Sequence, residues 1–167
     1  MIRAAALLAA LALPARAEVI HFCWLGANGY TMVGQMELDP KALLRRVATE
    51  RDVRRFRIAG YLDGELIGKW DLATAEPDDP WFLHFDTVER QFYPGAALGR
   101  GTTQGWNAGG TAQDCGPGGF GFNSGNFAQD FCLDGQWIEE SGVAPDTPFL
   151  VQDSPPDPLC RSYVPLS

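Results

Sequence analysis

Residues 23–40 read CWLGANGYTMVGQMELDP, and this stretch decides the fold class. Asn28-Gly29 favours a two-residue hairpin turn, because both residues tolerate a positive φ. After the turn, apolar and polar residues alternate, as in a strand with one buried face. We therefore predict a hairpin of residues 19–25 and 30–38, whose core face carries Tyr30, Met32, Gly34, Met36 and Leu38. Trp24 is expected on the opposite side of its strand from Cys23.

Two further turns repeat this pattern. Asp63-Gly64 separates residues 54–62 from residues 65–72, and Asp134-Gly135 separates residues 131–133 from residues 136–138. In the first of these hairpins one face is predicted to carry Phe56, Ile58, Gly60, Leu62, Leu66, Gly68, Trp70 and Leu72. With 12 prolines and 19 glycines in the chain, the three hairpins predict an all-β fold, an antiparallel β-sandwich or barrel.

The segments between the hairpins are less regular. Asp39 can cap a helix and Pro40 suits the first helical position, so one short connecting helix is predicted over residues 39–47. Residues 81–86 are predicted to form a strand that pairs with residues 88–93. Residues 94–125 are rich in glycine and are predicted to be loops. The proline-rich tail from about residue 145 is predicted to be extended and held by Cys160.

The first 17 residues carry the marks of a signal peptide. Arg3 precedes a short apolar run, and Ala15-Arg16-Ala17 matches the small-x-small cleavage pattern. We expect a single periplasmic or secreted domain of residues 18–167, with no membrane span, because no later apolar run approaches the roughly 20 residues that a spanning helix needs. The formal net charge of −8 disfavours a nucleic-acid partner, which requires a basic face.

The four cysteines all follow the predicted cleavage site. In an oxidising compartment an even number of cysteines predicts disulfides, and four cysteines allow three pairings. We favour Cys115 with Cys132, across the glycine-rich region, and Cys23 with Cys160, joining the first strand to the tail. A metal site is the alternative, but neither CxxC nor HxxxH spacing occurs, so no metal ligands and no cofactor are predicted.

Catalytic motifs are near misses. The serine in GFNSG lacks GxSxG spacing, and only two histidines occur. His84 and Asp86 are two residues apart and can share one face of a strand, which makes them candidates for acid–base chemistry. We favour the alternative that both occupy the solvated face, because a half-buried strand needs polar residues on that side in any case. A pair of carboxylates of the glycosidase type is a second catalytic option, but the sequence does not locate it.

The glycine-rich region holds the ligand-binding candidates Trp106, Asn107, Asn123 and Asn126. An aromatic ring and side-chain amides in polar segments suit a sugar, which stacks on the ring while its hydroxyls bond to the amides. The alternative is that these segments are structural loops and that Trp106 covers an open end of a sheet.

Several segments resemble a loose group of small secreted bacterial all-β proteins related to PEP-CTERM-anchored proteins. The resemblance covers roughly residues 19–142, in WLGANGYTMVGQMELD, ATERDVRRFRIAGYLDGELIGKWDL, FDTVERQF and AQDFCLDGQWIEES. It implies an extracytoplasmic all-β domain and supplies no catalytic residues. The final residues, CRSYVPLS, lack the PEP motif, apolar span and basic stop of the sorting tail, so anchoring through that tail is not expected.

These patterns predict a non-catalytic secreted or periplasmic binding or envelope module, whose partner is a polysaccharide or an envelope component. A small secreted hydrolase using His84 and Asp86 or a carboxylate pair is one alternative. A structural or protein-partner role is the other, and the oligomeric state is left open.

Overall fold

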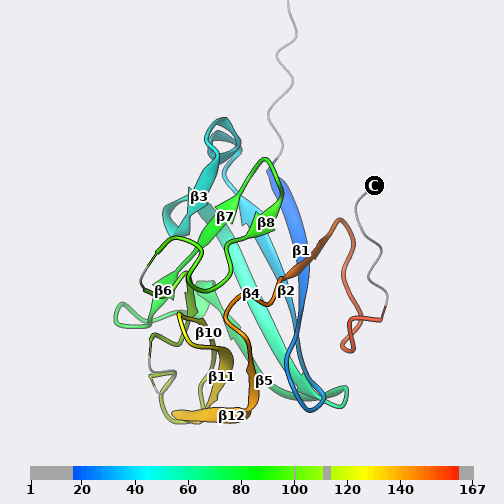
Figure 1. The fold of residues 1–167 in the computed structure, drawn as a ribbon. Coiled ribbons are helices and arrows are strands. Elements are labelled where there is room, and N and C mark those ends of the chain that lie inside the picture. The colour runs from blue at the N-terminus through cyan, green and yellow to red at the C-terminus, as the bar shows by residue number, and fades with distance from the viewer. Residues whose placement is uncertain (1–16, 100, 111–113, 162–167) are drawn as a thin grey trace, which may run out of the picture.

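The computed structural model describes residues 17–99, 101–110 and 114–161, so the predicted signal peptide, apart from Ala17, lies outside the described residues. Within these ranges the chain forms 13 strands and three 3₁₀ helices, and every strand pairing is antiparallel. The predicted all-β fold is confirmed. It is a sandwich of two five-stranded sheets with a third, three-stranded sheet at one end (Figure 1).

The strands fall into three sheets. Sheet I has the order β13-β1-β2-β4-β5, with β1 (Glu18–Leu25), β2 (Tyr30–Leu38), β4 (Val53–Leu62), β5 (Glu65–Asp71) and β13 (Leu150–Gln152). Sheet II has the order β12-β11-β10-β9-β6, with β6 (Trp81–Phe82), β9 (Gln104–Trp106), β10 (Phe120–Ser124), β11 (Gln129–Leu133) and β12 (Gln136–Val143). Sheet III has the order β3-β7-β8, with β3 (Val47–Thr49), β7 (His84–Asp86) and β8 (Gln91–Phe92).

The three predicted hairpin turns are all present. The residue before each glycine has a positive φ, 51° at Asn28, 52° at Asp63 and 53° at Asp134, and the glycines that follow have φ values between 71° and 88°. Two consecutive positive φ values define the turn whose twist matches that of antiparallel strands. These dipeptides therefore set the register of β1 with β2, β4 with β5, and β11 with β12.

The predicted core face of the first hairpin is confirmed. Met32, Met36 and Leu38 are fully buried, and so is Trp24 from the neighbouring strand. Gly34 lies in the same row, where a Cβ would be 2.1 Å from Cζ of Phe22. The absence of a side chain at Gly34 thus leaves room for the far end of the Phe22 ring.

One part of the face predicted for the second hairpin is wrong. Gly60 pairs with Gly68, but the next pair is Tyr61 with Leu66, so β5 carries an extra residue between the two pairs. This bulge turns Leu66 to the outer face of sheet I, where it is 58% exposed, whereas Trp70 stays on the core side and is buried.

The core between sheets I and II is rich in aromatic rings. Phe22 and Phe56 from sheet I meet Trp106 from sheet II at ring-centroid distances of 5.4 and 4.7 Å. The indole N–H of Trp24 in β1 donates a hydrogen bond of 2.6 Å to Oε1 of Gln129 in β11. The two sheets are therefore joined by ring packing and by a buried polar contact.

The glycine-rich region contains two strands, so its assignment to loops alone is wrong. Phe120 and Phe122 in β10 point into the core, and the intervening Gly121 points outward, where a Cβ would be 2.4 Å from the carbonyl oxygen of Asn107. Gly121 therefore allows the chain at Asn107 to lie close against sheet II, and it is not a sign of irregular structure.

The connecting segment after β2 is helical, as predicted, but shorter than residues 39–47. It forms the 3₁₀ helix η1 (Pro40–Leu44), and the Asp39 side chain caps it by accepting from the backbone N–H of Lys41. The other 3₁₀ helices are η2 (Glu50–Asp52) and η3 (Leu72–Thr74). Residues 91–92 form β8, which pairs with β7, so part of the predicted pairing in this region is confirmed. The single strand predicted over residues 81–86 is wrong, because the chain leaves β6 in sheet II and continues as β7 in sheet III.

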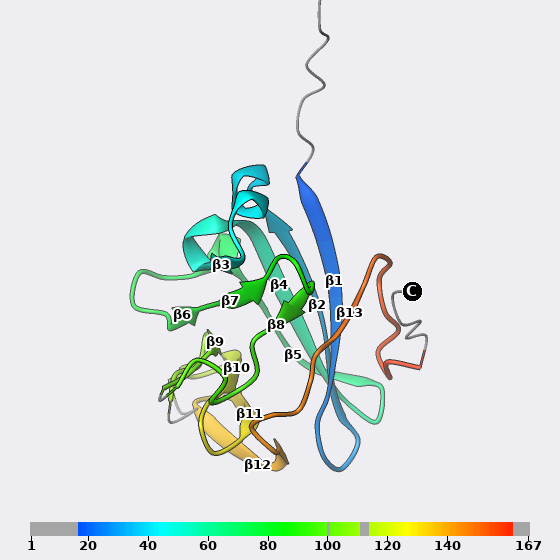
Figure 2. The same ribbon diagram turned by 45° about the horizontal axis from the view of Figure 1, so that its top comes forward.

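Both favoured disulfides are present. Cys23 is bonded to Cys160 and Cys115 to Cys132, with Cα–Cα distances of 5.9 and 6.0 Å. The tail is not merely extended, since β13 adds a strand to the edge of sheet I beside β1 before the chain reaches Cys160 (Figure 2). Across the described residues, no helix is long and apolar enough to cross a membrane.

Candidate functional site

The candidate site lies on the outer face of sheet II. Because Phe122 points into the core, its neighbour Asn123 points outward, and Asn123 is the Cα partner of Asp130 on β11. Asn123 and Asp130 are 4% and 5% exposed. Two polar side chains are therefore paired across neighbouring strands and almost completely buried.

An irregularity in β12 leaves space beside Asp130. Gln129 pairs with Val143 and Phe131 with Ile138, so residues 139–142 of β12 pass opposite Asp130 alone. The hydroxyl of Ser141 within this bulge accepts a hydrogen bond of 2.9 Å from the backbone N–H of Phe131. The bulge interrupts the ladder next to Asp130 without leaving the neighbouring backbone donor unpaired.

A pocket of about 260 Å³ opens at this point. Asn123 and Asp130 line it from the strands, Asn126 and Phe127 from the turn between β10 and β11, and Trp137 from β12. Phe127 is 95% exposed and Trp137 is 45% exposed. Two aromatic side chains that do not contribute to the core thus border a small pocket.

The Asp130 carboxyl is held in a poorly hydrated position. Burial raises the pKa of Asp130 to about 6, against the opposing effect of hydrogen bonds from the Asn123 and Trp137 side chains. The distance from Nδ2 of Asn123 to Oδ1 of Asp130 is 3.5 Å. No cationic side chain lines the pocket among the residues that the structure describes, so no ion pair offsets the cost of this buried charge.

The amide oxygens of the pocket lack partners. Oδ1 of Asn123 and Oδ1 of Asn126 are both buried and accept no hydrogen bond within the described chain. Nδ2 of Asn123 faces Asp130, which fixes the orientation of this amide and leaves its oxygen unpaired. Because buried polar atoms in folded proteins are nearly always hydrogen-bonded, these two oxygens are suited to donors from a ligand.

A third exposed aromatic ring lies on the same face. Phe82 in β6 is the Cα partner of Gly105, which in turn pairs with Asn123. Phe82 is 46% exposed, and a Cβ at Gly105 would be 2.7 Å from Cδ2 of its ring. The Phe82 ring therefore leans over Gly105 on the outer face of sheet II.

The structure divides the four predicted ligand-binding residues into two pairs. Asn123 and Asn126 line the pocket, whereas Trp106 is fully buried and packs against core rings. The expectation that Trp106 offers an exposed stacking surface is wrong, because Trp106 is the inward-facing residue of a strand and not part of a loop. Binding by Asn123 and Asn126 stays a prediction.

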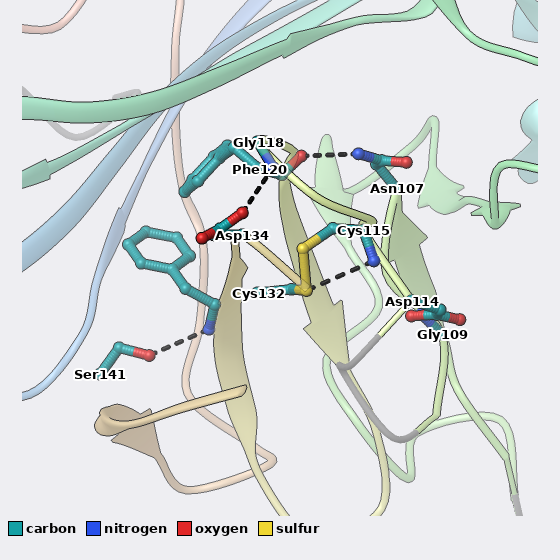
Figure 3. Close-up of a disulfide and its surroundings, with 10 residues drawn as sticks. Asn107, Gly109, Asp114, Cys115, Gly118, Phe120, Cys132, Asp134 and Ser141 are labelled. Carbon is teal, nitrogen blue, oxygen red and sulfur yellow. Dashed lines mark hydrogen bonds between the residues drawn. A yellow bond between two sulfur atoms is a disulfide. The ribbon is translucent and has the colours of Figure 1, made fainter. Parts of the chain in front are cut away.

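Asn107 has a structural role on the same sheet. Its side-chain amide donates a hydrogen bond of 2.9 Å to the carbonyl oxygen of Phe120, and its φ is 53°. Figure 3 shows this contact beside the Cys115–Cys132 disulfide, which attaches the chain after Asn107 to β11. This hydrogen bond holds the chain at Asn107 against β10, and Asn107 does not line the pocket.

The structure gives Asp86 a structural role as well. Its Oδ1 accepts from the backbone N–H groups of Val88 and Glu89, and its Oδ2 accepts from Arg46 and Tyr93, all between 2.9 and 3.0 Å. Burial opposes ionisation, but these hydrogen bonds prevail and lower the pKa of Asp86. The expected solvated position is wrong, since Asp86 is 5% exposed and holds the turn between β7 and β8.

The His84 ring is hydrogen-bonded to the backbone and not to Asp86. Its Nδ1 lies 2.9 Å from the carbonyl oxygen of Thr103. Neither His84 nor Asp86 lines the pocket on sheet II. No cluster of three or more metal-binding side chains occurs within residues 17–99, 101–110 and 114–161.

A larger pocket, of about 580 Å³, lies on the outer face of sheet I. Its wall includes His21, Gln35, Arg57 and Asp71, which are Cα partners across β1, β2, β4 and β5. Arg57 donates to Gln35, and burial together with Arg57 lowers the pKa of His21. Its polar groups are partly paired with one another, and the one indole among its described lining residues, that of Trp70, is buried, so this pocket is less suited to stacking a ligand.

Asp130, Phe127 and Trp137 were missed by sequence reasoning. The alternation of FGFNS, with phenylalanines inward, would have placed Asn123 outward, and pairing across SGNFAQ would have brought Asp130 beside it. The β12 bulge that opens the pocket has no comparable signal.

The comparisons with known proteins add no relative from which a function could be transferred. No protein-family model, no curated protein and no solved structure matches this chain. A function for this protein is therefore inferred from the geometry of the site.

Proposed function

We propose that the protein is an extracytoplasmic binding module that recognises a saccharide in the pocket on sheet II. The observation that supports this most directly is the combination of two unpaired, buried amide oxygens with two exposed aromatic rings around one pocket. Sugars carry hydroxyl donors at the edge of an apolar ring face, so they match acceptors placed beside aromatic side chains.

The size of the pocket suits a small unit of a longer chain. Its volume of about 260 Å³ is slightly below the range of roughly 300–1,000 Å³ typical of sites that enclose a drug-sized ligand. The exposed Phe82 ring gives a longer ligand a further contact on the same face. We therefore propose that one sugar unit enters the pocket while its neighbours lie along sheet II.

Localisation outside the cytoplasm is part of the proposal. Two disulfides are compatible with a periplasmic or extracellular protein, where thiols are oxidised. The predicted signal peptide points to the same compartments. An envelope or matrix polysaccharide is the kind of ligand that such a protein meets.

A binding role fits the pocket better than hydrolysis does. Asp130 is its only carboxyl group among the described lining residues, whereas glycosidases use two carboxyl groups about 5–9.5 Å apart. The alternative pair, His84 and Asp86, lies elsewhere and is engaged by backbone groups. A hydrolase therefore lacks its second catalytic group in this pocket.

The experiment is titration of the oxidised protein against a panel of oligosaccharides by calorimetry. We expect Phe127→Ala and Trp137→Ala each to weaken the binding of the best ligand at least about tenfold, which corresponds to about 1.4 kcal/mol. Leu44→Ala is the control, since Leu44 is 85% exposed but lies in η1, away from the pocket. If the aromatic variants bind every glycan as the unmodified protein does, the site assignment is wrong.

A further inference from the structure

We propose that the pocket selects a saccharide unit with a free, protonated amino group in preference to a neutral or acidic one. This inference concerns the ligand class of the proposed saccharide site and rests on that proposed function. It follows from the polarity of the groups that line the pocket and from the charge that they carry.

The pocket is rich in hydrogen-bond acceptors. Oδ1 of Asn123 and Oδ1 of Asn126 are unpaired, and the Asp130 carboxylate adds further acceptor oxygens. The side-chain N–H groups of Asn123 and Trp137, in contrast, are already directed at Asp130. An ammonium group, which brings three donors, matches this set of acceptors.

The charge of the pocket favours a cation. Asp130 is 5% exposed and has no cationic partner among the described lining residues. A bound ammonium group would supply that partner and form a charge-assisted hydrogen bond, which is roughly twice as strong as a neutral one. The net charge of −8 acts in the same direction at long range, because it attracts cationic and repels anionic polysaccharides.

The hydrogen bond from Trp137 leaves its ring face to the sugar. The indole N–H, which lies in the plane of the ring, is directed at Asp130, and Trp137 is 45% exposed. The carboxylate therefore lies at the edge of the indole, and the ring face stays open for stacking on the sugar ring. N-acetylation of the amine would remove both the charge and two of its three donors.

A metal ion satisfies this pocket less well than an ammonium group. Ca²⁺ takes six to eight oxygen ligands, usually including several carboxylates. Among the described side chains that line this pocket there are one carboxylate and two amide oxygens. The aromatic side chains of Phe127 and Trp137 that line the pocket also supply no ligand to a metal ion.

The experiment compares two oligosaccharides of equal length, one of glucosamine units with free amines and one of N-acetylglucosamine units, by calorimetry at pH 6.5. We expect the free-amine oligomer to bind at least tenfold more tightly. Asp130→Asn should abolish this preference. Glu65→Gln, which removes one carboxylate from an exposed position in β5 of sheet I, away from the pocket, should retain it.

The outcomes separate the two levels of the proposal. Equal affinity for both oligomers, with loss of binding in Trp137→Ala, would overturn the amine preference and leave saccharide binding standing. Binding of neither these oligomers nor any other glycan would overturn both. A lysine peptide of equal charge that binds as tightly as the free-amine oligomer, or a response to Ca²⁺ alone that depends on Asp130, would also overturn the assignment to an amino sugar.

Discussion

Replacing Asp130 by asparagine is expected to stabilise the folded protein at neutral pH while removing the proposed preference for a cationic ligand. The carboxyl is 5% exposed and its pKa is raised to about 6, above the ordinary aspartate value of 3.8. A tenfold change in a proton-binding constant corresponds to about 1.4 kcal/mol, so the difference between the two pKa values gives a ceiling of about 3 kcal/mol. Because the pocket admits solvent, we expect a gain of about 1–2 kcal/mol.

The sign of the pH dependence makes the prediction specific. Between about pH 4 and pH 6 the folded state keeps a proton on Asp130 that the unfolded state releases. The free energy of unfolding is therefore lowered progressively as the pH rises through this range. The full destabilisation by Asp130 is present above pH 6, and there is none below pH 4. Chemical denaturation of Asp130→Asn and the unmodified protein at pH 8 and pH 4 measures this cost. The stabilisation should be present at pH 8 and absent at pH 4.

Glu65→Gln, in β5 of sheet I, is the control for the loss of one negative charge from a protein of net charge −8. This variant should change the free energy of unfolding by no more than about 0.5 kcal/mol at either pH. The reasoning is refuted if Asp130→Asn is destabilised at pH 8, or if its stability relative to the unmodified protein is the same at both pH values.

Three further substitutions test the packing and the site. Gly34→Ala should destabilise the protein by about 1–3 kcal/mol in denaturant unfolding, because its Cβ would be 2.1 Å from the Phe22 ring; an unchanged midpoint would contradict the described packing. Trp106→Ala should cost about 3–5 kcal/mol and lower the amount of folded protein, whereas stability near that of the unmodified protein would show that the indole is not in the core. Phe127→Ala should leave the thermal midpoint within about 2 °C, measured by circular dichroism, since its ring is 95% exposed.

The hairpins were predictable because their turns are encoded locally. Asn28-Gly29 and the two Asp-Gly dipeptides set both the turn and the register, and the alternation around them identified the core face of β2. The disulfide pairing was favoured for a related reason, since Cys115 and Cys132 flank one local segment. Local chemistry and period-two patterning were sufficient for this part of the fold.

What could not be predicted depends on contacts between distant segments. Gly105 and Gly121 are strand residues, and each is a glycine because another segment packs closely over it. Composition alone does not distinguish such strand glycines from those of a glycine-rich loop. The burial of Trp106 required knowledge that its strand belongs to a sheet facing Phe22 and Phe56. The pocket depends on the bulge in β12, which only the paired strands reveal.

The position of β1 in sheet I has a consequence for biogenesis. β1 is among the first parts of the folded domain to be synthesised, yet one of its edges pairs with β13 and its Cys23 pairs with Cys160, 137 residues later. Until that late segment arrives, a strand with exposed backbone groups and a free thiol is open to other chains and to the wrong cysteine. Completion of sheet I is therefore a late event, and an oxidising compartment with a disulfide isomerase should raise the yield of correctly folded protein.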